Sequence, residues 1–302
     1  MRIEAMAPSP EIIIAATDFS DAAGLAVERA AAIARGHRWR LRLLHALGDG
    51  DLLERLDQGL RGEFSVELAR RAAGSRLARE RERLLAAGVA DVDYEVIEGT
   101  LPSLLPQVLH QGEHGVVVIG AQGETGFRQT LLGSTADRVL RSGALPVLLA
   151  RRDPGQPYRR VVLATDFSDS SLRAARLGLA LAAGAGFYLL HALELPPDRS
   201  LAFANASPET KEAFHHEARE RANRQLQAFG ARVGEGGVEL TRAVREGPPA
   251  AVLSAFVEEA EIDLVVLGSR PRARWEANLL GSTALFATNG LPCDVLLVPG
   301  GE

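Results

Sequence analysis

The sequence of 302 residues has one cysteine, one lysine, few aromatic residues and no long apolar run. Because Cys293 has no second cysteine to pair with, an internal disulfide is excluded, which fits a reducing compartment. No stretch approaches the roughly 20 apolar residues that a membrane-spanning helix requires. The first residues, MRIEAMAPSP, lack the basic and apolar regions of a signal peptide. We therefore expect a soluble cytoplasmic protein with no membrane partner.

An excess of positive charge is also missing. The formal net charge is −5, and arginines alternate with glutamates in stretches such as RRAAGSRLARERERLL. This alternation is typical of a solvated helix face rather than a basic surface, so we expect no nucleic-acid partner. The hydrophobic content of 46% and the chain length suit two domains with apolar cores.

The chain contains one pattern twice. IIIAATDFSD returns as VVLATDFSD, LLHAL and LLGSTA each occur twice, and Asp18 and Asp166 lie 148 positions apart, as do Gly120 and Gly268. Markers in the same order at a constant offset indicate two copies of one domain. The stretch RRDPGQPY between them cannot continue a helix or a central strand. We predict a first domain over 1–152, a linker over 153–158 and a second domain over 159–302.

Each copy alternates short β-type runs with helical segments. In the first copy, five strands are indicated by EIIIAAT, RLRLLHA, VDYEVIEG, GVVVIG and PVLLA. Helices are predicted over 20–36 and 63–88, with Ser20 as N-cap and with Gly36 and Gly88 as stops. The pattern predicts an α/β fold in which a five-stranded parallel sheet carries helices on both faces. Such sheets bind ligands beyond the carboxyl ends of their strands.

The stretch VVVIGAQGETGFRQTLLGST, residues 116–135, places glycines at such a strand end. Gly120, Gly123 and Gly133 can adopt positive φ and let backbone N–H groups approach an anion. A helix that begins at Ser134 and Thr135 adds unpaired N–H donors and the positive end of its dipole. The stretch therefore favours a phosphate site, although glycines can also simply end a strand. It is not a Walker loop, which needs a lysine before its Ser or Thr.

The spacing Gly-x2-Gly-x9-Gly-Ser, with TDFS after the first strand and LLHA on the second, resembles the universal stress protein family, in its ATP-binding branch. The resemblance covers nearly the whole chain as two tandem domains. It implies Rossmann-like domains of the adenine nucleotide alpha-hydrolase-like type. These pair through their last strands, here PVLLA and DVLLV, as an internal pseudo-dimer. A homodimer of whole chains is also compatible with it.

The resemblance further implies bound ATP, with Mg²⁺, as cofactor. The residues so implied in the first copy are Gly120, Gly123, Gly133, Ser134 and Thr135 at the phosphates, with Thr17, Asp18 and Ala46 at adenosine. Asp18 can accept hydrogen bonds from ribose hydroxyls or from the adenine amine, but it can also cap the following helix. His45 is expected to pack, or to satisfy a hydrogen bond, beneath the site. Gln122 and Arg128 are weaker candidates for phosphate contacts.

The second copy departs from this pattern at Pro271, which stands in place of Gly123. Proline fixes φ near −65° and removes an N–H donor, although Arg270, Arg272 and Arg274 could compensate with charge. We expect the first copy to bind ATP well. The second copy is expected to bind it weakly, to bind another adenosine ligand, or to be empty. Its retained candidates are Thr165, Asp166, Ala192, Gly268, Gly281, Ser282 and Thr283.

The last helix of the second copy is expected to be two residues shorter. The reason is that the interval from Gly281 to Pro292 is shorter than the interval from Gly133 to Pro146.

Other constellations are less informative. The set His110, Glu113 and His114 and the set His215-His216-Glu217 could be drawn as metal ligands, but their placement on helices does not favour a metal site. Cys293 precedes a buried strand and is interpreted as a packed thiol rather than a nucleophile. No Ser/His/Asp set or paired carboxylates stand at an informative spacing.

The leading hypothesis is a nucleotide-dependent regulatory or sensor protein, with the stress setting taken from the resemblance. A slow Mg²⁺-dependent ATPase is the enzymatic alternative, disfavoured because no general base can be named. A third hypothesis is a scaffold whose second domain binds another adenosine ligand or an apolar ligand.

Overall fold

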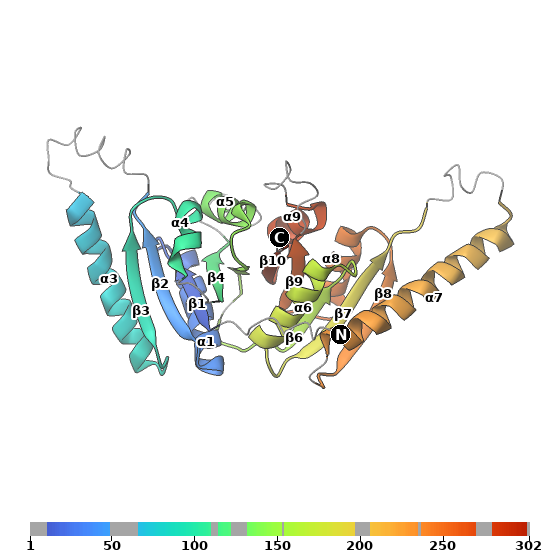
Figure 1. Ribbon diagram of the computed structural model, residues 1–302, viewed down its shortest axis with the longest axis horizontal. Helices are drawn as coiled ribbons and strands as arrows, with labels where there is room; N and C mark the ends of the chain where they lie inside the picture. Colours follow the sequence, from blue (N-terminus) through green and yellow to red (C-terminus); the bar gives the residue numbers. More distant parts are fainter. Residues whose placement is uncertain are drawn as a thin grey trace, which may run out of the picture.

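A computed structural model describes residues 11–48, 66–109, 114–121, 132–152, 154–196, 206–234, 237–269 and 280–300 (Figure 1). In these ranges the first half of the chain has the strands β1 (Ile12–Ala16), β2 (Arg40–Ala46), β3 (Val92–Ile97), β4 (Gly115–Gly120) and β5 (Val147–Ala150). Its helices are α1 (Asp21–His37), α3 (Val66–Ala86), α4 (Leu101–Val108) and α5 (Ser134–Ser142).

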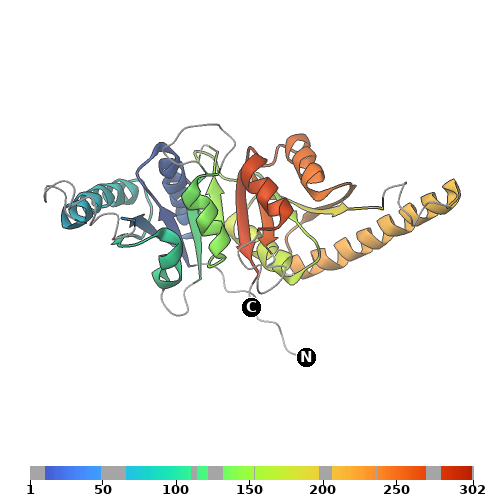
Figure 2. The same cartoon turned by 90° about the horizontal axis from the view of Figure 1, so that it is seen from above.

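The second half repeats this order. Its strands are β6 (Arg160–Ala164), β7 (Gly186–Leu193), β8 (Leu240–Glu246), β9 (Leu264–Ser269) and β10 (Asp294–Pro299). Its helices are α6 (Asp169–Leu181), α7 (Pro208–Val233), α8 (Pro249–Glu259) and α9 (Ser282–Gly290). Helices α3 and α7 extend outward at opposite ends of the molecule (Figure 2).

All described strands form one sheet in the order β3-β2-β1-β4-β5-β10-β9-β6-β7-β8. The strands within each half are parallel, and the halves meet where β5 and β10 pair antiparallel through Leu149 and Val295. The internal pairing through the last strands is thereby confirmed. In each half the strand order changes direction at the first strand, where such sheets bind ligands.

Both faces of the sheet are covered, as the uninterrupted apolar strands predict. Successive residues of β1 enter two different cores because side chains of a strand alternate between faces. Ile13 and Ala15 belong to the core that contains residues of α1, α3, α6 and α7, whereas Ile12 and Ile14 belong to the core that contains residues of α4, α5, α8 and α9. Figure 1 shows α4, α5 and α9 on the upper side of the sheet. The predicted α/β fold with helices on both faces is correct.

The helix boundaries agree in part with the expectations. Ser20 caps α1, since its Oγ accepts a hydrogen bond from Ala23 N, and Gly88 follows α3 with a φ of 88°. Gly36 does not stop α1, which continues to His37 and ends at Arg38 in the left-handed conformation.

The expected shortening of the last helix is wrong, because α5 and α9 both have nine residues. The strand registers show the reason. Val147 pairs with Val117 in the first half, and Val295 pairs with Val265 in the second half, so Val147 and Val295 are equivalent positions. The residue before each is therefore also equivalent, and Pro146 corresponds to Asp294 rather than to Pro292.

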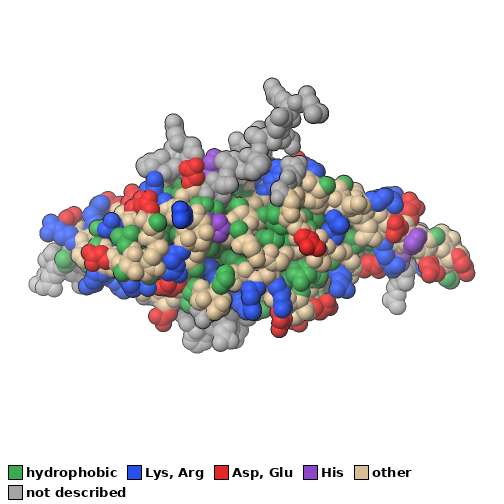
Figure 3. All heavy atoms as spheres, turned by 90° about the horizontal axis from the view of Figure 1, so that it is seen from below, with side chains coloured by type: hydrophobic (Ala, Val, Ile, Leu, Met, Phe, Trp, Pro, Cys, Tyr) green, Lys and Arg blue, Asp and Glu red, His purple; other side chains and the backbone are tan. Residues whose placement is uncertain are grey.

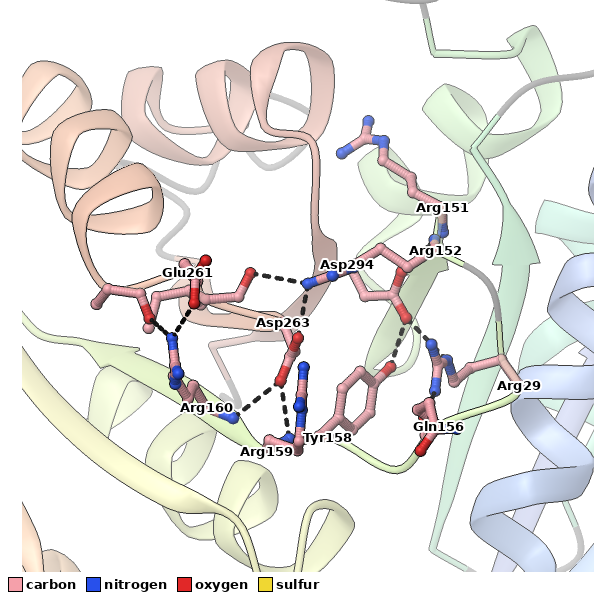
Figure 4. A network of polar contacts seen from close by, with 12 residues as sticks. Arg29, Arg151, Arg152, Gln156, Tyr158, Arg159, Arg160, Glu261, Asp263 and Asp294 are labelled. Carbon is pink, nitrogen blue, oxygen red and sulfur yellow. Dashed lines mark hydrogen bonds and ion pairs between the residues drawn. The ribbon is translucent and has the colours of Figure 1, made fainter.

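Asp294 joins the two halves, although its side chain is fully buried. Its carboxylate accepts hydrogen bonds from the backbone N–H groups of Arg151 (2.8 Å) and Arg152 (2.9 Å) and from the Tyr158 hydroxyl (2.6 Å). It also forms an ion pair with Arg29 of α1 at 2.9 Å (Figure 4). Burial, together with the charge of Asp294, raises the pKa of the Tyr158 phenol well above its ordinary value, so the phenol remains a donor.

Positively charged side chains and acidic side chains are interspersed over the face shown in Figure 3. Many of the arginines are in exposed ion pairs along a helix, such as Arg71 with Glu67 in α3. This arrangement is the solvated helix face that the alternating sequence predicts.

Candidate functional site

A cavity of about 350 Å³ lies beyond the carboxyl ends of β1, β2 and β4; we call it the first cavity. Its lining includes all the described residues proposed from the first copy: Thr17, Asp18, Ala46, Gly120, Gly133, Ser134 and Thr135. Gly123, Gln122 and Arg128 lie outside the described residues. The structure therefore brings together residues that are more than 100 positions apart in the chain.

The TDFS turn shapes one wall of this cavity. Thr17 Oγ1 accepts a hydrogen bond from Phe19 N at 3.0 Å. Asp18 Oδ1 accepts hydrogen bonds from the N–H and the hydroxyl of Ser20, at 3.0 and 2.6 Å. Ser20, rather than Asp18, is the N-cap of α1. Both hydrogen bonds from Ser20 go to Oδ1, and Asp18 is part of the cavity lining.

His45 supports the turn from below. Its Nδ1 lies 2.7 Å from Thr17 O, and because a carbonyl oxygen only accepts, Nδ1 carries the proton of this hydrogen bond. The His45 and Phe19 rings stack at 4.6 Å, and the Arg76 guanidinium lies 4.0 Å from the centre of the Phe19 ring. The expectation of a hydrogen bond beneath the site is met.

Gly120 has a packing role that the sequence did not reveal. A Cβ atom at Gly120 would lie 2.5 Å from Ala22 O, so only glycine allows the first turn of α1 to approach the end of β4. Gly268 is constrained in the same way, with Ser170 C at 2.6 Å. Gly120 and Gly133 do not use the positive φ that glycine permits, since neither is among the described glycines with positive φ.

The first turn of α5 forms the opposite wall. Gly133 is its N-cap, with φ −62° and no side-chain hydrogen bond. The next two residues, Ser134 and Thr135, are exposed. The first N–H groups of a helix have no acceptor within the helix, and they carry the positive end of its dipole. The exposed Arg138 also lines the cavity and adds a full positive charge. This wall can hold an anion.

Sequence reasoning missed Arg138, Gly48, Gly99 and Thr100, which all line the first cavity. Gly48 and Gly99 exchange backbone hydrogen bonds at 3.2 and 2.9 Å and have positive φ values of 88° and 114°. A signal for Gly99 existed, because Gly247 lies at the same offset in the second copy.

A second cavity of about 450 Å³ occupies the equivalent place in the other half. Its lining contains every residue proposed there: Thr165, Asp166, Ala192, Gly268, Gly281, Ser282 and Thr283. His191 and Phe167 repeat the support of the turn, with His191 Nδ1 2.9 Å from Thr165 O and the two rings 4.2 Å apart. Pro271 and the neighbouring arginines lie outside the described residues.

The remaining candidates lie away from both cavities. Cys293 is buried, and burial raises the pKa of its thiol to about 12, so the interpretation as a packed thiol is confirmed. His215 and His216 lie on α7, while His110 and Glu113 are outside the described residues. Among the helices that the structure describes, none is long and apolar enough to cross a membrane.

Comparison with known proteins gives a consistent result. The model of the universal stress protein family matches residues 10–151 and again residues 157–299. A universal stress protein of Methanocaldococcus jannaschii is 29% identical over 143 residues, which are 47% of this chain and 82% of that protein.

Solved structures resemble the whole fold. A universal stress protein from Archaeoglobus fulgidus matches with a TM-score of 0.67 and 19% identity, over 96% of this chain and 99% of that chain. A functionally unknown protein from Pseudomonas aeruginosa PAO1 matches with a TM-score of 0.66 and 19% identity, over 96% and 92%. At this identity the likeness concerns the fold alone.

Proposed function

The chain belongs to the universal stress protein family, and from this membership we propose that it binds ATP in the first cavity and acts as a nucleotide-dependent regulatory protein. One observation carries the proposal. An acceptor carboxylate, Asp18, and a cationic helix start with Arg138 line the same cavity. This combination matches a ligand with hydroxyl donors at one end and phosphates at the other.

The chemistry of each wall supports this orientation. A carboxylate beyond a strand end accepts hydrogen bonds from ribose hydroxyls, as in other nucleotide-binding α/β folds. The N–H groups of Ser134 and Thr135 at the start of α5 can donate to phosphate oxygens, and Arg138 can form charge-assisted hydrogen bonds with them. A volume of about 350 Å³ lies in the range of small-ligand sites.

A regulatory role is favoured over catalysis by the side chains that the first cavity offers. Within its described lining Asp18 is the only carboxylate and Arg138 the only cation. His45 donates its Nδ1 proton to Thr17 O beneath the site. At the start of α5, where the phosphates are proposed to lie, the described lining offers no carboxylate or histidine that could act as a general base. Magnesium would arrive with the nucleotide, and slow hydrolysis assisted by Mg²⁺ is the enzymatic alternative.

Calorimetric titration of the full chain with ATP and Mg²⁺ tests the proposal. We expect saturable binding that Arg138→Ala weakens about tenfold, since a charge-assisted hydrogen bond is lost. Arg141→Ala is the matched control: Arg141 lies on the same helix but pairs with Asp137 at 2.8 Å, and it should leave the affinity unchanged. Absence of ATP binding, or equal effects of the two variants, would contradict the proposal.

Phosphate release by the same protein distinguishes regulator from enzyme. If the protein is a regulator, the parent should release phosphate no faster than the Arg138→Ala variant. If it is an ATPase, the Arg138→Ala substitution should lower the turnover of ATP together with its binding.

A further inference from the structure

The TDFS turn of the first cavity contains a bulky residue in an unusual backbone conformation. Phe19 has a φ of 67°, in the left-handed region, and Phe167 has a φ of 65° at the same place of the second half. This region is disfavoured for residues with a Cβ atom, whereas glycine adopts it freely. A strained conformation of this kind persists only where surrounding contacts hold it. The phenylalanine ring supplies such contacts in both halves.

The ring of Phe19 anchors the turn. It is half-buried and packs against the core that contains residues of α1 and α3. It also stacks on His45 of β2 at 4.6 Å, and the guanidinium of Arg76 of α3 lies 4.0 Å from its centre. The Phe19 N–H donates to Thr17 Oγ1 at 3.0 Å, which closes the turn. Phe167 repeats both the packing against this core and the stacking on a histidine.

Asp18 lies between two anchored residues. Thr17 and Phe19 are half-buried, whereas Asp18 is exposed and lines the first cavity. Its Oδ1 accepts hydrogen bonds from the N–H and the hydroxyl of Ser20, which orient the carboxylate. The left-handed conformation thus places the Phe19 ring against the core and the neighbouring carboxylate in the cavity lining.

We infer that Phe19 is a positioning residue of the first cavity, whose anchored ring holds Asp18 in the orientation that contacts the adenosine end of the nucleotide. The inference rests on the proposed binding of ATP. Binding to a turn that is already ordered in its bound conformation loses less entropy, which raises the affinity. Glycine would adopt the same φ without strain, but it would leave the turn free to take other conformations.

Phe19→Gly tests this inference, because it removes the ring without opposing the backbone conformation. Calorimetric titration of the full chain should show an ATP affinity reduced about two- to tenfold, the range expected when a binding segment has to be ordered. Trp39→Leu is the matched control and should leave the ATP affinity unchanged, since Trp39 packs against the same core but is outside the described lining of the first cavity. Thermal unfolding checks that both variants are folded.

A double-mutant cycle separates positioning from a general structural role of the ring. Asp18→Ala alone should weaken ATP binding about tenfold, and adding Phe19→Gly should weaken it no further, because Phe19 acts through Asp18. Combined with Arg138→Ala, at the phosphate end, Phe19→Gly should instead multiply the two separate reductions. A merely structural role would multiply the reductions in both pairs.

His45→Asn gives a second route to the same measurement if Phe19→Gly does not fold. Asparagine keeps a donor for Thr17 O but removes the ring on which Phe19 stacks. It should lower the ATP affinity about twofold and add nothing to the effect of Asp18→Ala.

The outcomes separate this inference from the proposed function. If the parent binds ATP, an affinity that Phe19→Gly leaves unchanged, or reductions that multiply with Asp18→Ala, would overturn the inference alone. A parent protein that binds no ATP would overturn the proposed function and the inference with it.

Discussion

The position of Pro146 in the first half corresponds to that of Asp294 in the second, and Gly115 corresponds to Asp263. Both acidic residues of the second half hold the chain between the halves. Asp294 accepts the N–H groups of Arg151 and Arg152, and Asp263 accepts those of Arg159 and Arg160 at 2.8 and 3.0 Å. The comparison teaches that carboxylates of the second half anchor the segment that connects the halves. The first half has no carboxylates at the equivalent positions.

The same asymmetry extends to the ligand cavities. The first half keeps a cation, Arg138, at its helix start, whereas the second half has Phe286 there and adds Glu194. The described linings of the two cavities thus share a frame and differ in their charged residues. Each prediction below compares equivalent positions of the halves.

The largest effect is expected for Asp294→Ala. Removal of a buried carboxylate shared by Arg29, Tyr158 and two backbone N–H groups should lower the free energy of unfolding by about 3–5 kcal/mol. Chemical denaturation of the full chain measures this value. The exposed variant Arg71→Ala, which breaks a surface ion pair, serves as control and should change it by less than about 1 kcal/mol. A small loss for Asp294→Ala would show that this carboxylate is not an important anchor of the connection between the halves.

Gly120→Ala and Gly268→Ala should destabilise their halves to a similar extent, by about 1–3 kcal/mol each, because the added Cβ overlaps backbone atoms of the neighbouring helix. Gly281→Ala is the control, since nothing lies within 4 Å of its Cβ position and its φ of −58° suits any residue. Unfolding that is unchanged by Gly120→Ala would refute the packing role.

Removal of the helix caps should affect the halves unequally. Ser20→Ala should cost about 1 kcal/mol, which is typical of a lost N-cap. Ser168 is buried and also bonds the Ser170 hydroxyl at 2.8 Å, so Ser168→Ala should cost about 2 kcal/mol. Equal losses in denaturation would mean that the serine cluster of the second half adds no stability.

The smallest effect concerns pH. Burial raises the pKa of Cys293 from 9.0 to about 12, whereas the corresponding Leu145 cannot titrate. Because the folded state keeps the Cys293 thiol neutral, its contribution to the free energy of unfolding is complete below pH 9 and is lost as the pH rises toward 12. Between pH 8 and 10 the parent should therefore lose about 1 kcal/mol more than Cys293→Ala. Parallel pH profiles of the two proteins would contradict this assignment.

Much of the fold follows from particular residues. The repeated TDFS and LLGST motifs predict two similar halves, and the runs III and VVVI predict strands covered on both faces. Ser20 is recognisable as a cap because it precedes a helical pattern by one residue. These features depend on neighbours in the chain, which a sequence displays directly.

The missed features depend on neighbours in space. Arg138 is one of many arginines on helices, and only the order of the strands brings it to the cavity that Asp18 lines. Gly120 lacks a side chain because of Ala22, a residue almost 100 positions away. Aligning Pro292 with Pro146 concealed Asp294, since prolines are conspicuous while strand register is not visible in one sequence.

The central claim is that ATP occupies the first cavity with its phosphates at the start of α5. A crystal structure of the full chain grown with ATP and Mg²⁺ tests it most directly. The account predicts a triphosphate beside the backbone N–H groups of Ser134 and Thr135 and the guanidinium of Arg138. A first cavity without nucleotide, or a nucleotide there whose phosphates lie away from the start of α5, would contradict it.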